Sequence, residues 1–255
     1  MQNVVKIGVA GLGTVGAGTV KLLSEHRDNL TDRSGSPMTV TAVSARDRTR
    51  DRGFSTEGIT WYEDARDLAT DKNVDVVVET IGGSNGIAYD VCKAALENGK
   101  HVVTANKALI ALHGVELARI ADANNVTIAY EAAVAGGIPV IKALREGLAG
   151  NAISRVTGIL NGTCNYILTT MREQGRDFAD VLAEAQKLGY AEADPTMDVD
   201  GTDAAQKLAI LAHLAFGATV NWSDIPRIGI DGLDPDDLRY SRQLGYRIKL
   251  LALAN

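Results

Sequence analysis

The sequence has little cysteine, no long hydrophobic run and no concentration of basic residues, and each absence excludes a class of protein. Two of its 255 residues are cysteines, Cys92 and Cys164, and they form no CxxC pair. A disulfide framework or a cysteine-based zinc site is therefore not expected, and this usage is typical of a reducing cytoplasm.

No apolar stretch reaches the roughly 18 residues that a membrane-spanning helix needs. The chain runs directly into the strand-like segment Val4–Ala10, without the long apolar core and cleavage site of a signal peptide. The net charge of −6 is spread along the chain, with no basic patch or arm. We therefore expect a cytoplasmic protein that binds neither a membrane nor a nucleic acid.

The composition that remains is globular, and the first half of the chain alternates β-rich runs with helical patterns. Hydrophobic residues make up 45% of the chain and charged residues 23%, which is ordinary for a folded protein. The apolar run Val76–Val78 is typical of a strand buried on both faces. The alternation predicts right-handed βαβ crossovers and a parallel sheet. The expected strands are Val4–Ala10, Thr39–Ser44, Val74–Glu79, His101–Thr104 and Val126–Tyr130, and the expected helices are Thr14–Asn29, Ile87–Asn98 and His113–Asn124.

The pattern changes after Ala135–Gly137, where strands become fewer. We expect an α/β Rossmann-type domain at residues 1–137 and a separate α+β domain at residues 138–255. Leu244–Ala254 resembles the start of another strand or helix, yet the sequence stops at Asn255 without a polar tail. The second domain is therefore expected to be truncated at its C-terminus. Its expected elements are a strand at Ile153–Leu160 and helices at Ile138–Leu148, Thr163–Glu173, Asp177–Leu188 and Thr202–Phe216.

A glycine-rich loop lies between the first expected strand and the first expected helix. In this context G-x-G-x-x-G indicates a dinucleotide site, because its glycines permit a tight turn, close backbone approach to a pyrophosphate, and close packing of helix on strand. The helix N-terminus adds N–H groups and a positive dipole end. A glycine turn without a ligand is the alternative. We assign cofactor binding to Gly11, Leu12, Gly13, Thr14, Val15 and Gly16.

The tip of the second strand favours NADP over NAD. NAD enzymes usually place an acidic residue there, whereas Arg46 lies where a 2′-phosphate would be bound. Asp47 follows it directly, so NAD stays possible, and a solvated charged loop is the alternative. Thr80 follows the strand Val74–Glu79, and the loop that it opens is expected to lie near the cofactor's ribose or nicotinamide.

The expected helix Thr202–Phe216 carries a charged pair on its apolar side. Asp203 and Lys207 are i, i+4 neighbours within the arc that also holds Ile210, Leu211 and Leu214. We expect the pair to be partly buried, and buried ionisable groups require partners or a function. The alternative is a surface salt bridge of roughly 0.3–0.5 kcal/mol.

Three further segments carry a resemblance to a known family. They are Thr104–Lys107, Gly158–Tyr166 and the long segment Leu188–Lys207, and with the glycine loop they span essentially the whole chain. The sequence resembles homoserine dehydrogenases. The resemblance implies NAD(P)-dependent hydride transfer between L-homoserine and L-aspartate 4-semialdehyde, in the synthesis of threonine and methionine. It also implies that the second domain is catalytic and pairs two subunits, so a homodimer is expected.

The resemblance assigns roles to individual residues. Glu192 and Asp198 would hold an amino-acid substrate, and Lys107, Asp203 and Lys207 would surround the reacting carbon. A nascent alkoxide needs a proton and a nearby positive charge, both of which a lysine supplies. We assign Lys207 as the general acid/base and Asp203 as the group that positions Lys207 or a water. We assign Lys107 as a residue that orients substrate and cofactor. Alternatively, Lys107 shares the proton transfer with Lys207.

The resemblance also implies a monovalent cation such as sodium, bound through backbone carbonyls. Its ligands would be Glu131, Val134, Gly136 and Ile138, and a plain interdomain hinge is the alternative.

Two other functions stay open. Cys164 is a candidate nucleophile for an acylating semialdehyde dehydrogenase, but such an enzyme needs a base, and none of the four histidines lies in an obvious motif. The chain is alternatively a catalytically impaired NADP-binding fragment, since full homoserine dehydrogenases continue past Asn255.

Overall fold

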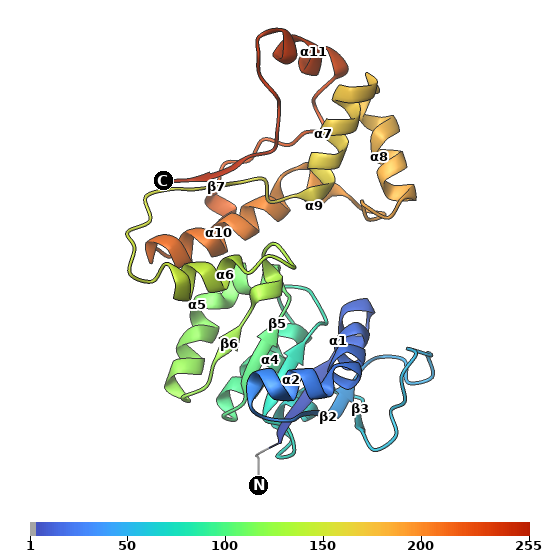
Figure 1. The fold of residues 1–255 in the computed structure, drawn as a ribbon, viewed down its shortest axis with the longest axis vertical. Coiled ribbons are helices and arrows are strands. Elements are labelled where there is room, and N and C mark those ends of the chain that lie inside the picture. The colour runs from blue at the N-terminus through green and yellow to red at the C-terminus, as the bar shows by residue number, and fades with distance from the viewer. Residues whose placement is uncertain (1–3) are drawn as a thin grey trace. The chain divides into compact units, whose positions relative to one another are not determined.

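The computed structural model describes residues 4–255, which form two compact units. The units are Met1–Pro139 and Val140–Asn255, so the division falls two residues after the boundary expected from sequence. Each unit has its own strands and helices (Figure 1).

The first unit is built on a six-stranded parallel sheet with the order β3-β2-β1-β4-β5-β6. The order reverses between β1 and β4, which is the point where doubly wound sheets bind ligands at their carboxyl ends. The expected Rossmann-type α/β fold is confirmed. Its elements are β1 Val5–Ala10, α1 Thr14–Glu25, α2 Arg27–Ser34, β2 Met38–Ser44, β3 Thr60–Tyr62, α3 Ala65–Thr70, β4 Val76–Glu79, α4 Ile87–Glu97, β5 His101–Thr104, α5 Lys107–Ala123 and β6 Ile128–Ala129.

Two expected helices have different bounds in the structure. The helix predicted over Thr14–Asn29 is two helices, because His26 leaves the helical conformation and the polar segment that follows buries no residue. The helix predicted from His113 begins at Lys107, where the Asn106 side chain accepts a hydrogen bond from the Leu109 N–H at 3.1 Å. An asparagine directly before a helical run is a recognised start signal, but the prediction placed the start of this helix at His113. The short elements β3 and α3 were not predicted.

The second unit contains helices and a two-stranded antiparallel sheet. Helix α7 buries one side, because its apolar residues recur at helical spacing, whereas α10 is buried on all sides from Thr202 to Ala212 apart from Lys207. The expected α+β character is confirmed. Its elements are α6 Val140–Lys142, a π-helical turn η2 at Ala143–Gly147, β7 Val156–Gly158, α7 Gly162–Gln174, α8 Phe178–Lys187, α9 Thr196–Val199, α10 Thr202–Phe216, η3 Trp222–Asp224, α11 Pro235–Gln243 and β8 Ala252–Ala254.

Three elements of the second unit differ from expectation. The helix expected at Ile138–Leu148 has one α-helical turn and then widens into a π turn. The strand expected at Ile153–Leu160 is limited to Val156–Gly158, because only these residues pair with β8. Helices α9 and α11 were not predicted, since both begin in loops rich in proline and aspartate. Within residues 4–255, no helix combines the length and apolarity that crossing a bilayer requires.

Candidate active site

The glycine-rich loop has the geometry of a dinucleotide cradle. Gly11 has φ of +95°, and a Cβ there would lie 2.7 Å from the Thr80 carbonyl oxygen. A Cβ at Gly16 would lie 1.9 Å from the Gly11 carbonyl oxygen, so α1 packs on the loop too closely for a side chain. A Cβ at Gly13 would meet nothing within 4 Å, so this glycine leaves space open in front of the helix N-terminus. The residues present therefore fit a pyrophosphate at this loop.

Thr80 and Arg52 hold this loop in place from two neighbouring segments. The Thr80 hydroxyl donates to the Gly11 carbonyl at 2.7 Å, and its N–H donates to Ala10 at 2.8 Å. The Arg52 guanidinium, missed by sequence reasoning, donates to the Leu12 carbonyl at 3.1 Å. These contacts border a cavity of about 620 Å³. Its lining includes Gly11, Leu12, Gly13, Ser44, Ala45, Arg46, Asp47, Arg50, Arg52, Thr80 and Ile81.

The loop after β2 contains both the acidic and the basic residue on which the choice between NAD and NADP depends. Asp47 accepts hydrogen bonds from the Thr49 N–H at 2.8 Å and the Thr49 hydroxyl at 2.7 Å, and these bonds lower the pKa of its carboxyl group. Asp47 is therefore engaged within its own turn. Arg46 is exposed and lines the cavity, as Arg50 does, and the carboxylates of Asp47, Glu63 and Asp64 line it as well.

A buried carboxylate at the end of β4 organises the next loop. Glu79 is completely buried and accepts hydrogen bonds from the Ile81 N–H at 2.7 Å, the Gly82 N–H at 3.0 Å and the Thr104 hydroxyl at 2.5 Å. The Asn106 side chain donates to the Gly83 carbonyl at 2.6 Å, so the loop is also joined to the start of α5. One carboxylate thus ties the ends of β4 and β5 together.

Replacement of Glu79 by glutamine is expected to lower the free energy of unfolding by about 1–3 kcal/mol. The amide can replace one carboxylate oxygen, but its NH₂ group cannot accept the Thr104 hydroxyl proton. Weaker NADPH binding should accompany this loss of stability, because the loop that begins at Thr80 is no longer held in one conformation. Urea unfolding and calorimetric titration measure the two effects, with exposed Glu97→Gln as the control. Unchanged values in both measurements would show that Glu79 does not hold this loop.

Lys107 is the first residue of α5, directly after the Asn106 cap. It therefore lies at the carboxyl end of β5, as expected, and it is partly buried. This position belongs to the same edge of the sheet as the glycine loop and Thr80.

In the second unit, Asp203 and Lys207 form the buried pair that the helical wheel predicted. Their side chains are 5% and 18% exposed, and the Lys207 Nζ lies 2.7 Å from the Asp203 Oδ2. The same ammonium donates to the Leu160 carbonyl at 2.8 Å. The expectation of partial burial is confirmed, and a solvated surface salt bridge is excluded.

Asn161 joins this pair to a second carboxylate. Its Nδ2 donates to the Asp203 Oδ2 at 2.9 Å and to the Asp198 Oδ1 at 2.7 Å. Its Oδ1 accepts from the Cys164 N–H at 2.7 Å, which caps α7. Asn161 lies within the segment Gly158–Tyr166, and no role was predicted for it, although an asparagine at a helix start is a recognisable cap.

These residues line a cavity of about 510 Å³ within the second unit. Asp198, Asp203 and Lys207 supply its charges, and Tyr166 and Tyr190 form an aromatic wall with ring centroids 4.9 Å apart. Glu192 is exposed and does not line this cavity. The structure thus brings together three of the four residues predicted in this unit.

Cys164 has the environment of a structural residue. Its thiol is fully buried and donates to the Asp198 carbonyl at 3.1 Å. Burial, followed by nearby carboxylates, raises its pKa to about 12. The nucleophilic thiolate is therefore strongly disfavoured near neutral pH, and nothing in the structure favours an acylating enzyme.

The segment expected to bind a monovalent cation forms a tight turn at the end of the first unit. Ala135 has φ of +51°, and the Ile138 N–H donates to the Ala135 carbonyl at 2.9 Å. The Ala133 N–H donates to the Tyr130 carbonyl at 2.9 Å. The four expected ligands, Glu131, Val134, Gly136 and Ile138, lie within or beside this turn.

Comparisons with known proteins cover nearly all of the chain. The family described as "Homoserine dehydrogenase, NAD binding domain" matches residues 11–131, and the family "Homoserine dehydrogenase" matches residues 139–254. A homoserine dehydrogenase of Pseudomonas aeruginosa is 52% identical over 250 residues, which are 98% of this chain and 57% of that protein.

Solved structures agree with the sequence matches. A homoserine dehydrogenase from Thiobacillus denitrificans is 46% identical with a TM-score of 0.94, and the match covers 100% of this chain and 58% of that one. A hyperthermophilic archaeal homoserine dehydrogenase in complex with NADPH is 27% identical with a TM-score of 0.81, covering 99% of this chain and 79% of that one. This chain therefore spans between about half and four fifths of the proteins that it matches.

Proposed function

This chain belongs to the homoserine dehydrogenase family, and on that premise we propose that it serves the reversible oxidation of L-homoserine to L-aspartate 4-semialdehyde with a nicotinamide cofactor. The observation that carries the proposal is the buried Lys207–Asp203 pair on a cavity that also holds Asp198. This arrangement offers a proton donor and acceptor beside carboxylates that attract an ammonium group.

The proton step is assigned to Lys207. In the reducing direction the carbonyl oxygen of the substrate becomes an alkoxide, and the Lys207 ammonium donates the proton that converts it to a hydroxyl. Asp203 and the Leu160 carbonyl hold the Nζ atom in one place, at 2.7 and 2.8 Å. The nicotinamide, when bound, supplies or accepts the hydride.

Substrate orientation is assigned to carboxylates and to a second lysine. Asp198 lines the cavity and is the proposed partner of the substrate ammonium. Glu192 is proposed as a second substrate ligand through the family resemblance, and its exposed position requires the loop after α8 to close over the substrate. Lys107 is proposed to orient substrate and cofactor from the first turn of α5.

The proposed cofactor is NADP, with NAD as the weaker alternative. Arg46 and Asp47 both line the cavity beside the glycine loop, and the Oδ1 atom of Asp47 is bonded within its own turn. A guanidinium pairs well with a phosphate, and an engaged carboxylate is poorly placed to accept a ribose hydroxyl.

Replacement of Arg46 by alanine is expected to weaken NADPH binding by about tenfold or more while changing NADH binding little, because only NADPH carries the 2′-phosphate. Arg48→Ala is the matched control, since Arg48 lies over the Trp61 ring at 5.7 Å and does not line the cavity. Dissociation constants for both cofactors provide the measurement. Equal losses for NADPH and NADH would show that Arg46 does not bind the 2′-phosphate.

Three further features are proposed from the family resemblance. A monovalent cation such as sodium would be held by the carbonyl oxygens of Glu131, Val134, Gly136 and Ile138. The protein would act as a homodimer that pairs through the catalytic unit, and it would work in the cytoplasm on a small amino-acid substrate.

The function is tested by following reduced nicotinamide in the near ultraviolet after L-homoserine is added with NADP or NAD at alkaline pH. We expect reduction with L-homoserine but not with L-serine or L-threonine. NADPH binding without any turnover would identify this chain as a catalytically impaired fragment. Absence of both binding and turnover would contradict the cofactor assignment as well.

A further inference from the structure

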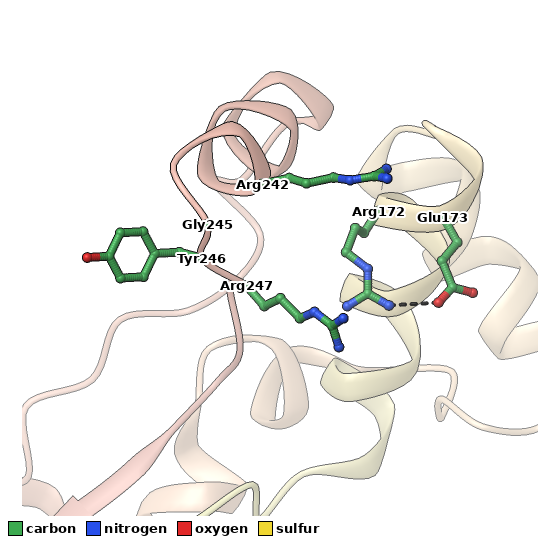
Figure 2. A pocket seen from close by; sticks show the side chains of 6 residues that line it. All are labelled: Arg172, Glu173, Arg242, Gly245, Tyr246 and Arg247. Atoms are coloured by element: carbon green, nitrogen blue, oxygen red, sulfur yellow. Dashed lines mark hydrogen bonds and ion pairs between the residues drawn. The ribbon is translucent and has the colours of Figure 1, made fainter.

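A second charged cavity lies in the second unit, away from the residues of the candidate active site. It has a volume of about 430 Å³ and is lined by Arg172, Glu173, Arg242, Gly245, Tyr246 and Arg247. None of these residues lines the cavity that holds Lys207. Figure 2 shows the side chains of Arg172, Arg242 and Arg247 extending into the space between α7 and α11, while Tyr246 points away.

The backbone holds these arginines together by well-defined contacts. Leu238 of α11 and Met171 of α7 belong to the same buried cluster, so the two helices are packed on each other. After α11 the chain turns at Gly245, with φ of +81°, and the Tyr246 N–H donates to the Ser241 carbonyl at 2.8 Å. This turn places Arg247 on the side of the segment that faces Arg172.

Positive charge in the cavity exceeds negative charge. Glu173 is the carboxylate in the lining, and it lies 2.7 Å from the Arg172 Nη2. Lys249, beside the cavity, donates to Asn165 and Thr169 and has its pKa lowered by burial and then by repulsion from Arg172 and Arg247. The excess is local, since the whole chain has a net charge of −6.

The helix dipoles explain part of this arrangement but not all of it. Arg172 and Arg242 lie in the last turns of α7 and α11, where the negative dipole ends favour cations. Arg247 lies outside both helices, yet its guanidinium extends into the same space. Arg242 and Arg247 are exposed, so both guanidinium groups are open to an anion from solution.

We propose that the cavity between α7 and α11 binds a phosphate group, free or as part of a small phosphorylated molecule. Guanidinium groups present pairs of N–H donors that match phosphate oxygens, and donors that approach from three backbone positions suit a tetrahedral anion. The site does not depend on the hydride-transfer reaction, because no residue is shared between the two cavities.

The test is calorimetric titration with inorganic phosphate in a chloride buffer. The unaltered chain should bind phosphate, and Arg242→Gln and Arg247→Gln should each weaken this binding by about tenfold or more. Arg239→Gln is the control, since Arg239 lies on α11 but pairs with Asp236 at 3.0 Å outside the cavity. Phosphate bound at the glycine loop would be unaffected by these substitutions. A loss of binding in the two variants therefore places the phosphate in the cavity between α7 and α11.

Thermal unfolding separates binding from folding. Without phosphate, Arg242→Gln should unfold at nearly the same temperature as the unaltered chain, because Arg242 is exposed and its loss removes both a favourable helix-dipole interaction and repulsion from the other arginines. With phosphate, only the unaltered chain and the control should gain stability. The proposal would be overturned by absence of phosphate binding, by phosphate binding in both cavity variants as tight as in the unaltered chain, or by tighter binding of succinate than of phosphate.

Discussion

Replacement of Lys207 by methionine is expected to lower turnover of L-homoserine by roughly two to four orders of magnitude, with NADPH binding nearly unchanged. Methionine fills a similar volume but carries no proton, so the alkoxide has no donor beside it. The glycine loop lies in the other compact unit and does not depend on Lys207 for its conformation. Single-turnover rates and calorimetric titration with NADPH provide the two measurements.

Folding must be controlled in this experiment. Lys207→Met leaves the Asp203 carboxylate buried without its ammonium partner, which destabilises a protein. The double variant Lys207→Met with Asp203→Asn should recover stability without recovering turnover. Exposed Lys187→Met should change neither quantity. Turnover close to that of the unaltered chain in Lys207→Met would remove this residue from the mechanism.

Replacement of Gly16 by alanine is expected to weaken NADPH binding by about tenfold to a hundredfold and to lower the free energy of unfolding by about 1–3 kcal/mol. The added Cβ would lie 1.9 Å from the Gly11 carbonyl oxygen and 2.6 Å from the Thr80 Oγ1. The glycine loop must therefore move away from α1. Calorimetric titration and urea unfolding measure the two losses.

The matched control lies half a turn further along the same helix. A Cβ at Gly18 would meet nothing within 4 Å, so Gly18→Ala should stabilise α1 by up to about 1 kcal/mol through helix propensity and leave NADPH binding intact. If both substitutions had the same effect on binding, close packing of α1 on the loop would not be the reason for glycine at residue 16.

The parts of the fold that could be predicted are those whose signals are local. Val76–Val78 is apolar throughout because β4 is buried in the sheet, and the glycine loop is recognisable because the backbone leaves no space for a side chain at Gly11 and Gly16. The burial of Asp203 and Lys207 followed from their place on the apolar arc of α10. Each of these inferences needed only one strand or one helix.

The parts that could not be predicted depend on residues far apart in the sequence. Asn161 bonds Asp198 and Asp203 across 37 and 42 positions, and Glu79 accepts a hydrogen bond from Thr104 across 25. No periodicity encodes such pairs. Arg172 and Arg247 likewise lie on separate segments, and their shared cavity exists only once α11 packs on α7.

The Asn161 side chain also has a consequence for the charge that the cavity offers to a ligand. Both of its N–H donors are used by carboxylates and its oxygen caps α7, so its amide cannot rotate to suit another ligand. With both carboxylates ionised and Lys207 protonated, the charged groups that line the cavity sum to −1. The ammonium of a zwitterionic amino acid can pair with a carboxylate of this cavity, whereas an N-acylated amino acid brings only its own negative charge. We therefore expect the cavity to favour amino acids with a free ammonium group over N-acylated ones.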